Sequence, residues 1–286
     1  MELRHLRYFV ATASAGTVSG AAGRLHLTQP GLSRQLRQLE RDLGVALFDR
    51  SGGRLVLSAA GAALLPQARD LLQRASDLQV AAAFHARGRL ARLTIGAPTV
   101  TLTDVVSPFI ATLAPEDPTT DVLGADGLSP VETLRQGADL AIGTVRPAAP
   151  FRALPLAVLP VWAYVPPDHE WAARGGVTLP DLLGEPLIVL PPAFTARQAL
   201  DASGFSSSDA VEAANGTVAQ ALAAAGRGIA VVSDDPRFGL VPLAVDGLVI
   251  RLVAVWDSRH VAAATLGEFA GRLGRFVRDR YDAPAG

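Results

Sequence analysis

Apolar residues in the first 45 positions recur at helical spacing and predict three short amphipathic helices. The three apolar stripes consist of Leu3, Leu6, Phe9, Val10 and Ala13, then Val18, Ala21, Ala22 and Leu25, then Leu32, Leu36, Leu39 and Leu43. Thr17 and Thr28 precede the second and third stripes, where a threonine hydroxyl can accept from an amide left unpaired in the first helical turn. Pro30 falls in the first turn of the third helix, where a missing N–H costs little.

Residues 17–43 therefore predict two helices joined by a tight turn, the arrangement of a helix-turn-helix. The outer face of the second of these helices carries Gln29, Ser33, Arg34, Arg37, Gln38 and Arg41. An ordinary surface helix with a solvated charged face would show a similar pattern. Here the two caps, the small Ala21–Ala22 pair that permits close helix crossing, and the positive face occur together, and this combination favours DNA binding.

Two short apolar runs, 46–48 and 55–57, flank a Gly52–Gly53 turn and predict a β-hairpin. Arg50 and Arg54 stand near its tip, which suits a wing resting on the phosphate backbone. An ordinary turn would have the same Ser-Gly-Gly sequence. A nucleotide-binding phosphate loop does not fit, because the chain contains no lysine and no P-loop pattern.

The next stretch predicts a long helix that begins at Ser58 and breaks into a hinge at residues 85–89. Its apolar positions follow a heptad seam made of Leu64, Ala68, Leu71, Ala75, Leu78 and Ala82. Thirty residues at 1.5 Å each would form a rod of roughly 45 Å. The seam favours pairing with a second copy of the chain, because two winged units recognise more base pairs than one. Packing of the seam onto its own domain is the alternative.

From residue 92 onward, strand-like runs alternate with helical segments. The expected strands are 93–96, 138–143, 158–165, 187–190 and 228–232, and the expected helices include 105–113, 131–136 and 218–225. Strands separated by helices argue for a parallel α/β arrangement. In such sheets ligands bind beyond the carboxyl ends of the strands, near helix N-termini.

The first 92 residues and the rest of the chain have opposite net charges. Residues 1–92 hold 13 arginines and six acidic residues, a net charge of +7, whereas the remainder has a net charge of −8. A basic front and an acidic back indicate a polyanion-binding module joined to a module with another task. The length of 286 residues fits about two domains.

Composition excludes several other classes. The chain has no cysteine, so disulfides, thiol catalysis and cysteine-ligated metals are excluded. No apolar run approaches the roughly 18 residues of a membrane span, and the chain begins on an amphipathic helix rather than a signal peptide, so we expect a cytoplasmic protein without a membrane partner.

Two alternative classes share the C-terminal pattern. An α/β enzyme would need a set of catalytic residues, but the chain has no G-x-S-x-G elbow and no dinucleotide fingerprint. We therefore expect no cofactor. The five histidines, His5, His26, His85, His169 and His260, lack metal-ligand spacing. A solute-binding protein would need an export signal and would not carry a basic helix-turn-helix.

The sequence resembles the LysR-type transcriptional regulators over essentially the whole chain. The resemblance rests on 3–9 (LRHLRYF), Ala21-Ala22, Arg24-Leu25, Thr28-Gln29-Pro30, 32–35 (LSRQ), Leu39-Glu40, Leu43-Gly44, 47–50 (LFDR), Leu57-Ser58 and Gly61, followed by 138–142, 186–188 and 226–230. The N-terminal block is highly specific, and the later blocks support it collectively.

The resemblance implies an α+β multidomain fold. It comprises a winged helix-turn-helix at 1–57, a linker and dimerisation helix with a hinge at 58–88, and a two-lobed effector domain like a periplasmic binding protein at 89–286. One lobe would comprise 92–160 with 260–286, and the other 161–259. The implied partners are double-stranded DNA with a pseudo-palindromic operator, a small-molecule effector, further copies of the chain as a dimer or tetramer, and RNA polymerase.

The resemblance also implies which residues do the work. The expected DNA-binding residues are Gln29, Pro30, Ser33 and Arg34 in the groove, Arg50 and Arg54 on phosphates, and Arg37 as a further contact. The expected effector-binding residues are Thr99, Val100, Thr101, Thr144, Arg146, Phe194, Thr195 and Thr217. Hydroxyls at converging helix N-termini favour a small anion such as a carboxylate, although each threonine could equally be a helix cap. Arg197 could pair with the ligand or form a surface salt bridge.

Three glycines depart from the family pattern. Gly20, Gly23 and Gly31 occupy helix positions where better helix formers are usual, and each could cost roughly 1 kcal/mol against alanine. Because Gly31 lies next to the base-contacting positions, the operator preference of relatives cannot be carried over.

Overall fold

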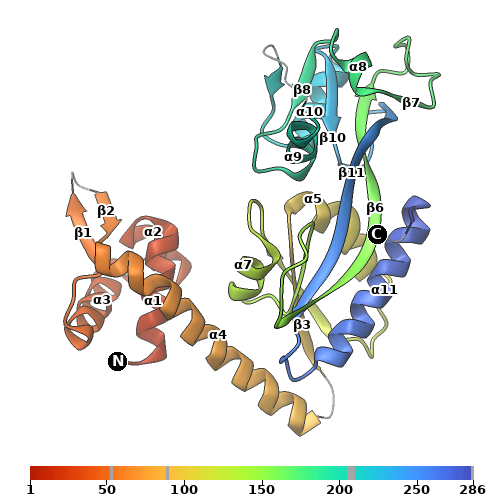
Figure 1. The fold of residues 1–286 in the computed structure, drawn as a ribbon. Helices are drawn as coiled ribbons and strands as arrows, with labels where there is room; N and C mark the ends of the chain where they lie inside the picture. Colours follow the sequence, from red (N-terminus) through yellow and green to blue (C-terminus); the bar gives the residue numbers. More distant parts are fainter. Residues whose placement is uncertain (52–53, 88–89, 205–209, 285–286) are drawn as a thin grey trace. The chain divides into compact units, whose positions relative to one another are not determined.

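The computed structural model describes residues 1–51, 54–87, 90–204 and 210–284, which form two compact units (Figure 1). One unit is built mainly from Met1–Ala83, and the other from Phe84–Leu134 and Ala138–Gly286.

The first unit contains the predicted helix-turn-helix and hairpin. Its elements are α1 (Leu3–Ala15), α2 (Val18–Arg24), α3 (Gln29–Leu43), β1 (Phe48–Ser51), β2 (Arg54–Leu57) and most of α4 (Ala59–Arg87). The two strands pair antiparallel, with Phe48 opposite Leu57 and Ser51 opposite Arg54. The expected Gly52–Gly53 turn lies outside the described residues.

Both predicted helix caps are confirmed. The Thr17 hydroxyl accepts from the Gly20 amide at 3.1 Å, and the Thr28 hydroxyl accepts from the Gly31 amide at 3.3 Å. Between the two helices, His26 adopts a left-handed backbone conformation with φ of 53°, which closes the turn tightly.

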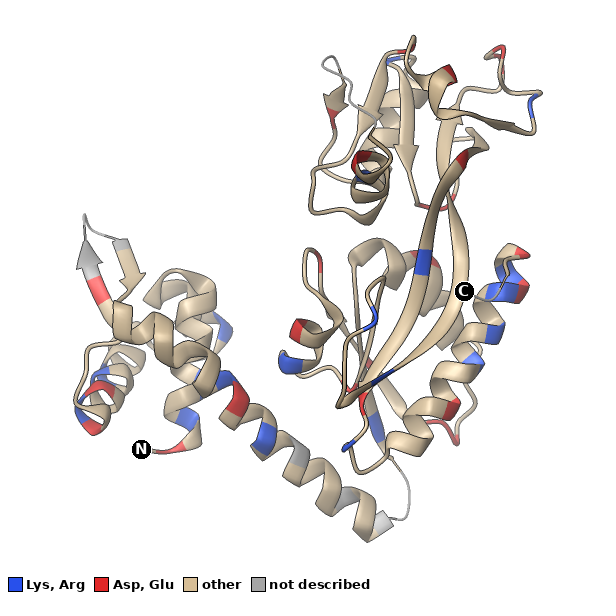
Figure 2. Cartoon of the chain, viewed as in Figure 1, with Lys and Arg blue, Asp and Glu red and all other residues tan. Residues whose placement is uncertain are grey.

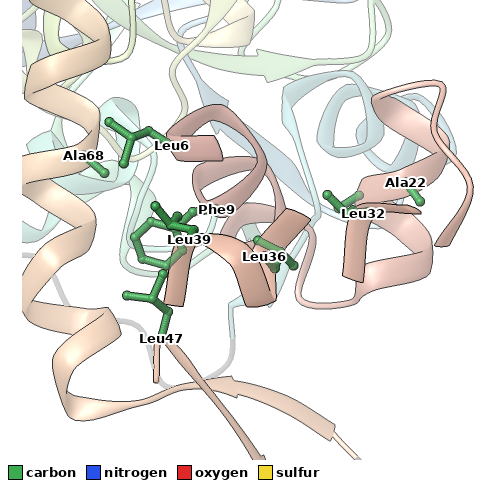
Figure 3. Close-up of a cluster of buried hydrophobic side chains, with 9 residues drawn as sticks. Leu6, Phe9, Ala22, Leu32, Leu36, Leu39, Leu47 and Ala68 are labelled. Carbon is green, nitrogen blue, oxygen red and sulfur yellow. The ribbon is translucent and has the colours of Figure 1, made fainter. Parts of the chain in front are cut away.

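A single apolar core holds this unit together (Figure 3). Its buried members are Leu6, Phe9, Ala21, Ala22, Leu32, Leu36, Leu39, Leu47 and Ala68. The ring of Phe48, at the start of the hairpin, meets the Phe9 ring edge-to-face at 5.6 Å. Leu43 was expected on the buried side of α3, but it is 36% exposed because it is the last helical residue and lies beyond the core.

The start of α4 is locked to the end of α3 and to the hairpin. The Ser58 hydroxyl donates to the Ala46 carbonyl at 2.6 Å and accepts from the Gly61 amide at 2.9 Å. A Cβ on Gly61 would lie only 2.0 Å from the Leu47 carbonyl oxygen, so this close approach requires glycine. Glu40 on α3 accepts from the Leu47 amide at 2.9 Å.

The heptad seam of α4 divides into two parts. Ala68 is buried in the core, and Leu64, Leu65 and Leu72 pack against it. Further along, Leu71 is 45% exposed and Leu78 is 71% exposed. Packing onto its own domain, the alternative considered above, therefore accounts for the first part of the seam but not for the exposed leucines.

The second unit is built on a mixed sheet. Its strands are β3 (Arg92–Ala97), β4 (Thr119–Gly124), β5 (Leu140–Gly143), β6 (Phe151–Val165), β7 (Gly176–Val177), β8 (Leu187–Val189), β9 (Val211–Glu212), β10 (Ile229–Val232) and β11 (Val241–Asp257), in the order β4-β3-β5-β11-β6-β10-β8-β9 with β7 beside β11. The pairs β3·β4, β3·β5, β8·β10 and β8·β9 are parallel, as expected. The expected parallel arrangement does not extend to β6 and β11, which run antiparallel to each other and to their other main neighbours, β10 and β5.

The two long strands pass through both lobes of this unit. Phe151–Pro160 of β6 pairs with Val249–Asp257 of β11 beside β5, whereas Trp162–Val165 pairs with Val241–Ala244 beside β10 and β7. The sequence assigned residues 161–259 to the second lobe. The pairing instead returns the chain to the first lobe at about Val249, because β11 crosses back before it ends.

Helices cover the sheet in both lobes. They are α5 (Thr99–Thr101), a π-helical turn η1 (Leu102–Val106), α6 (Ser107–Ile110), α7 (Pro130–Arg135), α8 (Leu179–Leu182), α9 (Thr195–Ala202), α10 (Gly216–Ala224) and α11 (Ala263–Tyr281). The helix expected at 105–113 begins six residues earlier, at Thr99. The β-branched residues at 99–101 have low helix propensity, which is why the sequence did not predict this start.

Within the described residues, no helix is long and apolar enough to cross a membrane. The same residues contain no group of three or more histidine or acidic side chains arranged to hold a metal ion.

The structure shows that the three helical glycines differ in the space around them, so alanine should affect stability differently at each. A Cβ at Gly20 or Gly31 would lie 2.8 Å or 2.9 Å from the capping threonine hydroxyl, whereas a Cβ at Gly23 would meet nothing within 4 Å. We expect Gly23→Ala to stabilise the first unit by about 0.5–1 kcal/mol. Gly20→Ala must displace the Thr17 cap, so that gain should be lost.

Amide hydrogen exchange of α3, followed by mass spectrometry, reports the opening of this unit alone. Gly23→Ala should slow exchange by about threefold, with Gly20→Ala as the matched control. Equal slowing in the two variants would contradict the role assigned to the cap.

Candidate nucleic-acid interface and interlobe pocket

The outer face of α3 is polar and accessible. Gln29, Pro30, Arg34 and Arg37 are exposed, and Ser33 is half-buried. Figure 2 marks both basic and acidic positions along this helix. All five predicted DNA-binding residues of α3 therefore lie on one solvent-facing side, opposite the buried leucines of the same helix.

Contacts with α1 and with the N-terminus of the chain fix the position of α3. The ring Nε2 of buried His5 on α1 lies 2.9 Å from Oε1 of Gln35. At the far end of the helix, Arg41 donates to Gln38 at 2.6 Å and Gln38 donates to Asp42 at 2.7 Å. The N-terminal ammonium, 2.9 Å from Asp42, and the Gln38 amide hold the pKa of that carboxyl below its usual range.

The arginines of α3 are engaged to different degrees. Arg37 donates to the Ser33 carbonyl at 3.3 Å, and Arg41 is held by Gln38. In the described part of the chain Arg34 has no acidic partner within ion-pair distance. Its guanidinium can therefore bind a base or a phosphate without first losing an internal partner.

The hairpin follows α3 directly, as a wing would. The backbone of Arg50 lies in β1 opposite Leu55, and that of Arg54 lies in β2 opposite Ser51. The side chains of Arg50 and Arg54 lie outside the described part of the structure, so their expected phosphate contacts remain a prediction.

The second unit contains a pocket between its lobes with a cavity volume of about 240 Å³. Apolar groups from both lobes line it, including Val100, Val105, Leu159, Trp162, Phe194, Ile250 and Leu252. Polar groups of the lining include Thr101, Asp104, Asp126, Ser129, Thr144, Thr195, Gln198, Ser233 and Tyr281. A concave, mostly apolar space with a few polar groups is the usual form of a small-molecule site.

The structure brings five of the eight predicted effector residues to this pocket, namely Val100, Thr101, Thr144, Phe194 and Thr195. Thr99, Arg146 and Thr217 are exposed and do not line it. Arg197 does not line it either: its guanidinium pairs with Asp201 at 2.7 Å and donates to the Leu190 carbonyl, which agrees with the surface salt bridge considered above.

Thr99 is bonded to a carboxylate of the chain itself. Its amide donates to Asp126 Oδ1 at 2.8 Å, and its hydroxyl donates to Asp126 Oδ2 at 2.5 Å. This strand-to-helix turn is where the sequence predicted a ligand carboxylate. Because Asp126 already uses both donors, the expectation of an anionic effector gains no support from this part of the pocket.

A polar network joins the lobes beside the pocket. Asp104 on η1 accepts from the Asp235 amide and from the Arg237 guanidinium, both at 2.9 Å. The hydroxyl of Tyr281 on α11 lies within hydrogen-bond distance of the Asp104 carbonyl oxygen, at 2.9 Å, and of a carboxylate oxygen of Asp235, at 2.8 Å. Arg280 donates to the other oxygen of Asp235 at 2.8 Å.

This network shifts the titration of its members. Burial raises the pKa of Asp104, against the lowering effect of the Asp235 amide and of Arg237. Burial also raises the pKa of the Tyr281 hydroxyl, and it raises that of Tyr164, whose hydroxyl donates to the Asp234 carbonyl at 2.6 Å.

Asp234 has the most strongly shifted carboxyl of this region. Burial, together with the negative charge of Asp104, raises the pKa of Asp234 from 3.8 to about 6. Its carboxyl lies against the first residue of α10, since a Cβ on Gly216 would fall 2.0 Å from Asp234 Oδ2. The close approach explains why position 216 holds glycine.

Sequence reasoning missed the acidic and tyrosine residues of this network. Asp104, Asp234, Asp235 and Tyr281 belong to segments up to 177 residues apart, and no local pattern connects them. The Asp234-Asp235 pair, one residue beyond the predicted strand at 228–232, was the available signal, because strand ends face the ligand side of such sheets.

Models of known families match both units. The bacterial regulatory helix-turn-helix protein, lysR family, matches residues 3–62, and the LysR substrate binding domain matches residues 86–277.

Known proteins similar to this chain are regulators. The HTH-type transcriptional regulator TfdT of Cupriavidus pinatubonensis is 37% identical over 199 residues, which cover 67% of this chain and 86% of that protein. The uncharacterised HTH-type transcriptional regulator YnfL of Escherichia coli is 32% identical over 201 residues, 67% of this chain and 66% of that protein.

Solved structures share the fold over nearly the whole chain. CbnR, described as a LysR family transcriptional regulator, aligns with a TM-score of 0.66 at 23% identity and covers 96% of this chain and 99% of its own. Full-length CbnR in complex with its target DNA aligns with a TM-score of 0.64 at 24% identity, over 96% of this chain and all of that chain (100%). At these identities the likeness establishes the fold.

The raised pKa of Asp234 predicts a pH-dependent stability of the second unit. Its folded-state pKa exceeds the unfolded value, so the contribution of the neutral carboxyl is fully present below about pH 4 and is lost as the pH rises through about 6. Asp234→Asn, which stays neutral, should be more stable than the native chain at pH 8 by about 3 kcal/mol, and equally stable near pH 4.

Urea unfolding followed by tryptophan fluorescence measures this unit selectively, because Trp162, Trp171 and Trp256 all lie in it. Asp168→Asn, at an exposed position, is the matched control and should leave the pH profile unchanged. Parallel profiles for the native chain and Asp234→Asn would refute the effect of burial on this carboxyl.

Proposed function

The chain belongs to the LysR family of bacterial transcriptional regulators, and we propose that α3 contacts operator bases while a small molecule in the interlobe pocket controls that binding. Membership makes it a DNA-binding transcriptional regulator with a substrate-binding domain. That its relatives are regulators argues against an enzyme.

The observation that carries the proposal is the exposed polar side of α3, held in place by buried leucines and by the His5–Gln35 contact. The proposed groove contacts are Gln29, Pro30, Ser33, Arg34 and Arg37, with Arg50 and Arg54 on the phosphate backbone. The complex of CbnR with its target DNA supports this, because that protein shares the fold.

We further propose that the chain acts as a homodimer or tetramer in the cytoplasm. The exposed Leu71 and Leu78 of α4 support pairing of two linker helices, since exposed leucines at heptad spacing gain from burial against a second copy. The proposed organisation is 1–57 for DNA binding, 58–88 for dimerisation and 89–286 for the effector. Contact with RNA polymerase is part of the same proposal, because regulators bound beside a promoter lie within its reach.

Substitution of Arg34 tests the base contact. The DNA probe is a fragment enriched from a random library by the full-length native protein, compared with a scrambled fragment at about 0.15 M salt. Arg34→Ala should weaken binding of the enriched fragment by about 5- to 150-fold, the value of one good base contact, and binding of the scrambled fragment much less.

Arg41→Ala is the matched control, because Arg41 lies on the same helix but is bonded to Gln38. Arg41→Ala should change the binding affinity for the two fragments by the same factor. An equal loss on both fragments for Arg34→Ala would mean that Arg34 contacts phosphate and does not select bases.

Substitution of Leu78 tests the linker interface. Leu78→Arg places a charge on the proposed seam, and sedimentation of the full chain should change from dimer to monomer at micromolar concentration. Ser76→Arg, an exposed position on another side of α4, should leave the dimer intact. A Leu78→Arg protein that still sediments as a dimer would exclude this seam.

A further inference from the structure

The charges around the interlobe pocket differ from those that an anionic ligand requires. The described lining contains two carboxylates, Asp104 and Asp126, and no arginine or histidine. Recognition of carboxylates and phosphates normally uses arginine or lysine, and this chain has no lysine.

The two carboxylates are in different electrostatic states. Asp104 is bonded to the Asp235 amide and paired with Arg237, so its charge is balanced and both its oxygens are engaged. Asp126 is exposed, and among the described residues it forms no ion pair; its partners are the amide and hydroxyl of Thr99. Its negative charge is therefore offset only by neutral donors.

Asp126 also occupies the hydrogen-bond donors that an anion would use. The Thr99 amide and hydroxyl are both bonded to it, at 2.8 Å and 2.5 Å. A ligand carboxylate at this turn would have to displace Asp126 and would then lie beside an unpaired like charge, which disfavours it. A ligand ammonium would instead meet a carboxylate with lone pairs to spare.

The remaining walls fit an apolar body. Trp162 and Phe194 contribute aromatic side chains, and Leu159, Ile250 and Leu252 come from the two long strands. A cavity volume of about 240 Å³ suits a molecule the size of a substituted ring. The hydroxyls of Thr101, Thr144 and Thr195 add polar partners that carry no charge.

On the premise that this pocket is the effector site of the proposed function, we propose that the effector carries no negative charge and is an apolar, ring-sized amine whose ammonium group is directed at Asp126. The lining selects against an anion through Asp126 and through the absence of a cationic side chain among the described lining residues. An uncharged molecule of the same shape binds more weakly than the amine, because it gains only the apolar contacts.

Three probes that share one ring and differ in charge test this inference: benzylamine, benzyl alcohol and benzoate. Titration calorimetry of the full-length protein at neutral pH should rank their affinities in that order, with benzylamine at least about tenfold tighter than benzoate. Benzoate affinity equal to or above that of benzylamine overturns the proposal. So does the absence of benzylamine binding up to about 10 mM.

Asp126→Asn separates the carboxylate from the rest of the pocket. An asparagine can still accept from the Thr99 amide, so the turn should keep its structure. The variant should lose the preference for benzylamine over benzyl alcohol while its benzyl alcohol affinity stays unchanged, and Asp168→Asn should behave like the native chain. An unchanged amine preference in Asp126→Asn would assign the selectivity elsewhere and overturn the role of Asp126.

Selective retention of the enriched DNA fragment by the same preparations tests the proposed function independently. If DNA selectivity persists while benzoate binds best, the ligand class is wrong and the regulator assignment stands. If DNA selectivity is absent, the proposed function fails regardless of the ligand ranking.

Discussion

The pairing of β6 with β11 is the constraint on which the second unit depends. The two strands continue from one lobe into the other, so the backbone ladder that builds each lobe also joins them. The register is interrupted between Ala244 and Val249, where both strands change neighbours. Side chains from this crossing line the pocket, namely Leu159, Pro160, Trp162, Ile250 and Leu252. The pocket therefore lies where the two continuous strands connect the lobes.

A second connection lies at the edge of the same pocket. Asp104 and Tyr281 belong to the first lobe, and Asp235 and Arg237 belong to the second. A ligand can favour one arrangement of lobes only if its free energy of interaction differs between the arrangements. Asp104 and Tyr281 both line the pocket and hold the network, so contacts with a ligand there would alter the groups that join the lobes. Binding of a ligand in the pocket can therefore change the arrangement of the two lobes through these groups.

The first unit could be predicted almost entirely from its sequence, because its determinants are local. Thr17 and Thr28 each accept from an amide only three residues further along the chain, and the apolar stripes have the period of the helices that they form. Gly20 and Gly31, which looked unfavourable by propensity, leave space for those caps. Leu43 was misassigned because a stripe gives the face of a helix but not the point where the core ends.

The second unit could be predicted only in outline, because its decisive contacts are distant in sequence. Residues 241–257 mix Pro242 and Gly247 with apolar runs, and only pairing with β6 makes them one strand. The same limit applies to the charge of the ligand, because the expectation of an anion rested on local sequence alone. In sequence, Thr99 looks like an open helix start, and the carboxylate that occupies it lies 27 residues further along, at Asp126. Local patterns reveal which donors a turn offers, but whether a donor is available depends on partners that only the folded chain brings there. The electrostatic character of a pocket is therefore a property of tertiary structure, even where the family and its fold are clear from the sequence.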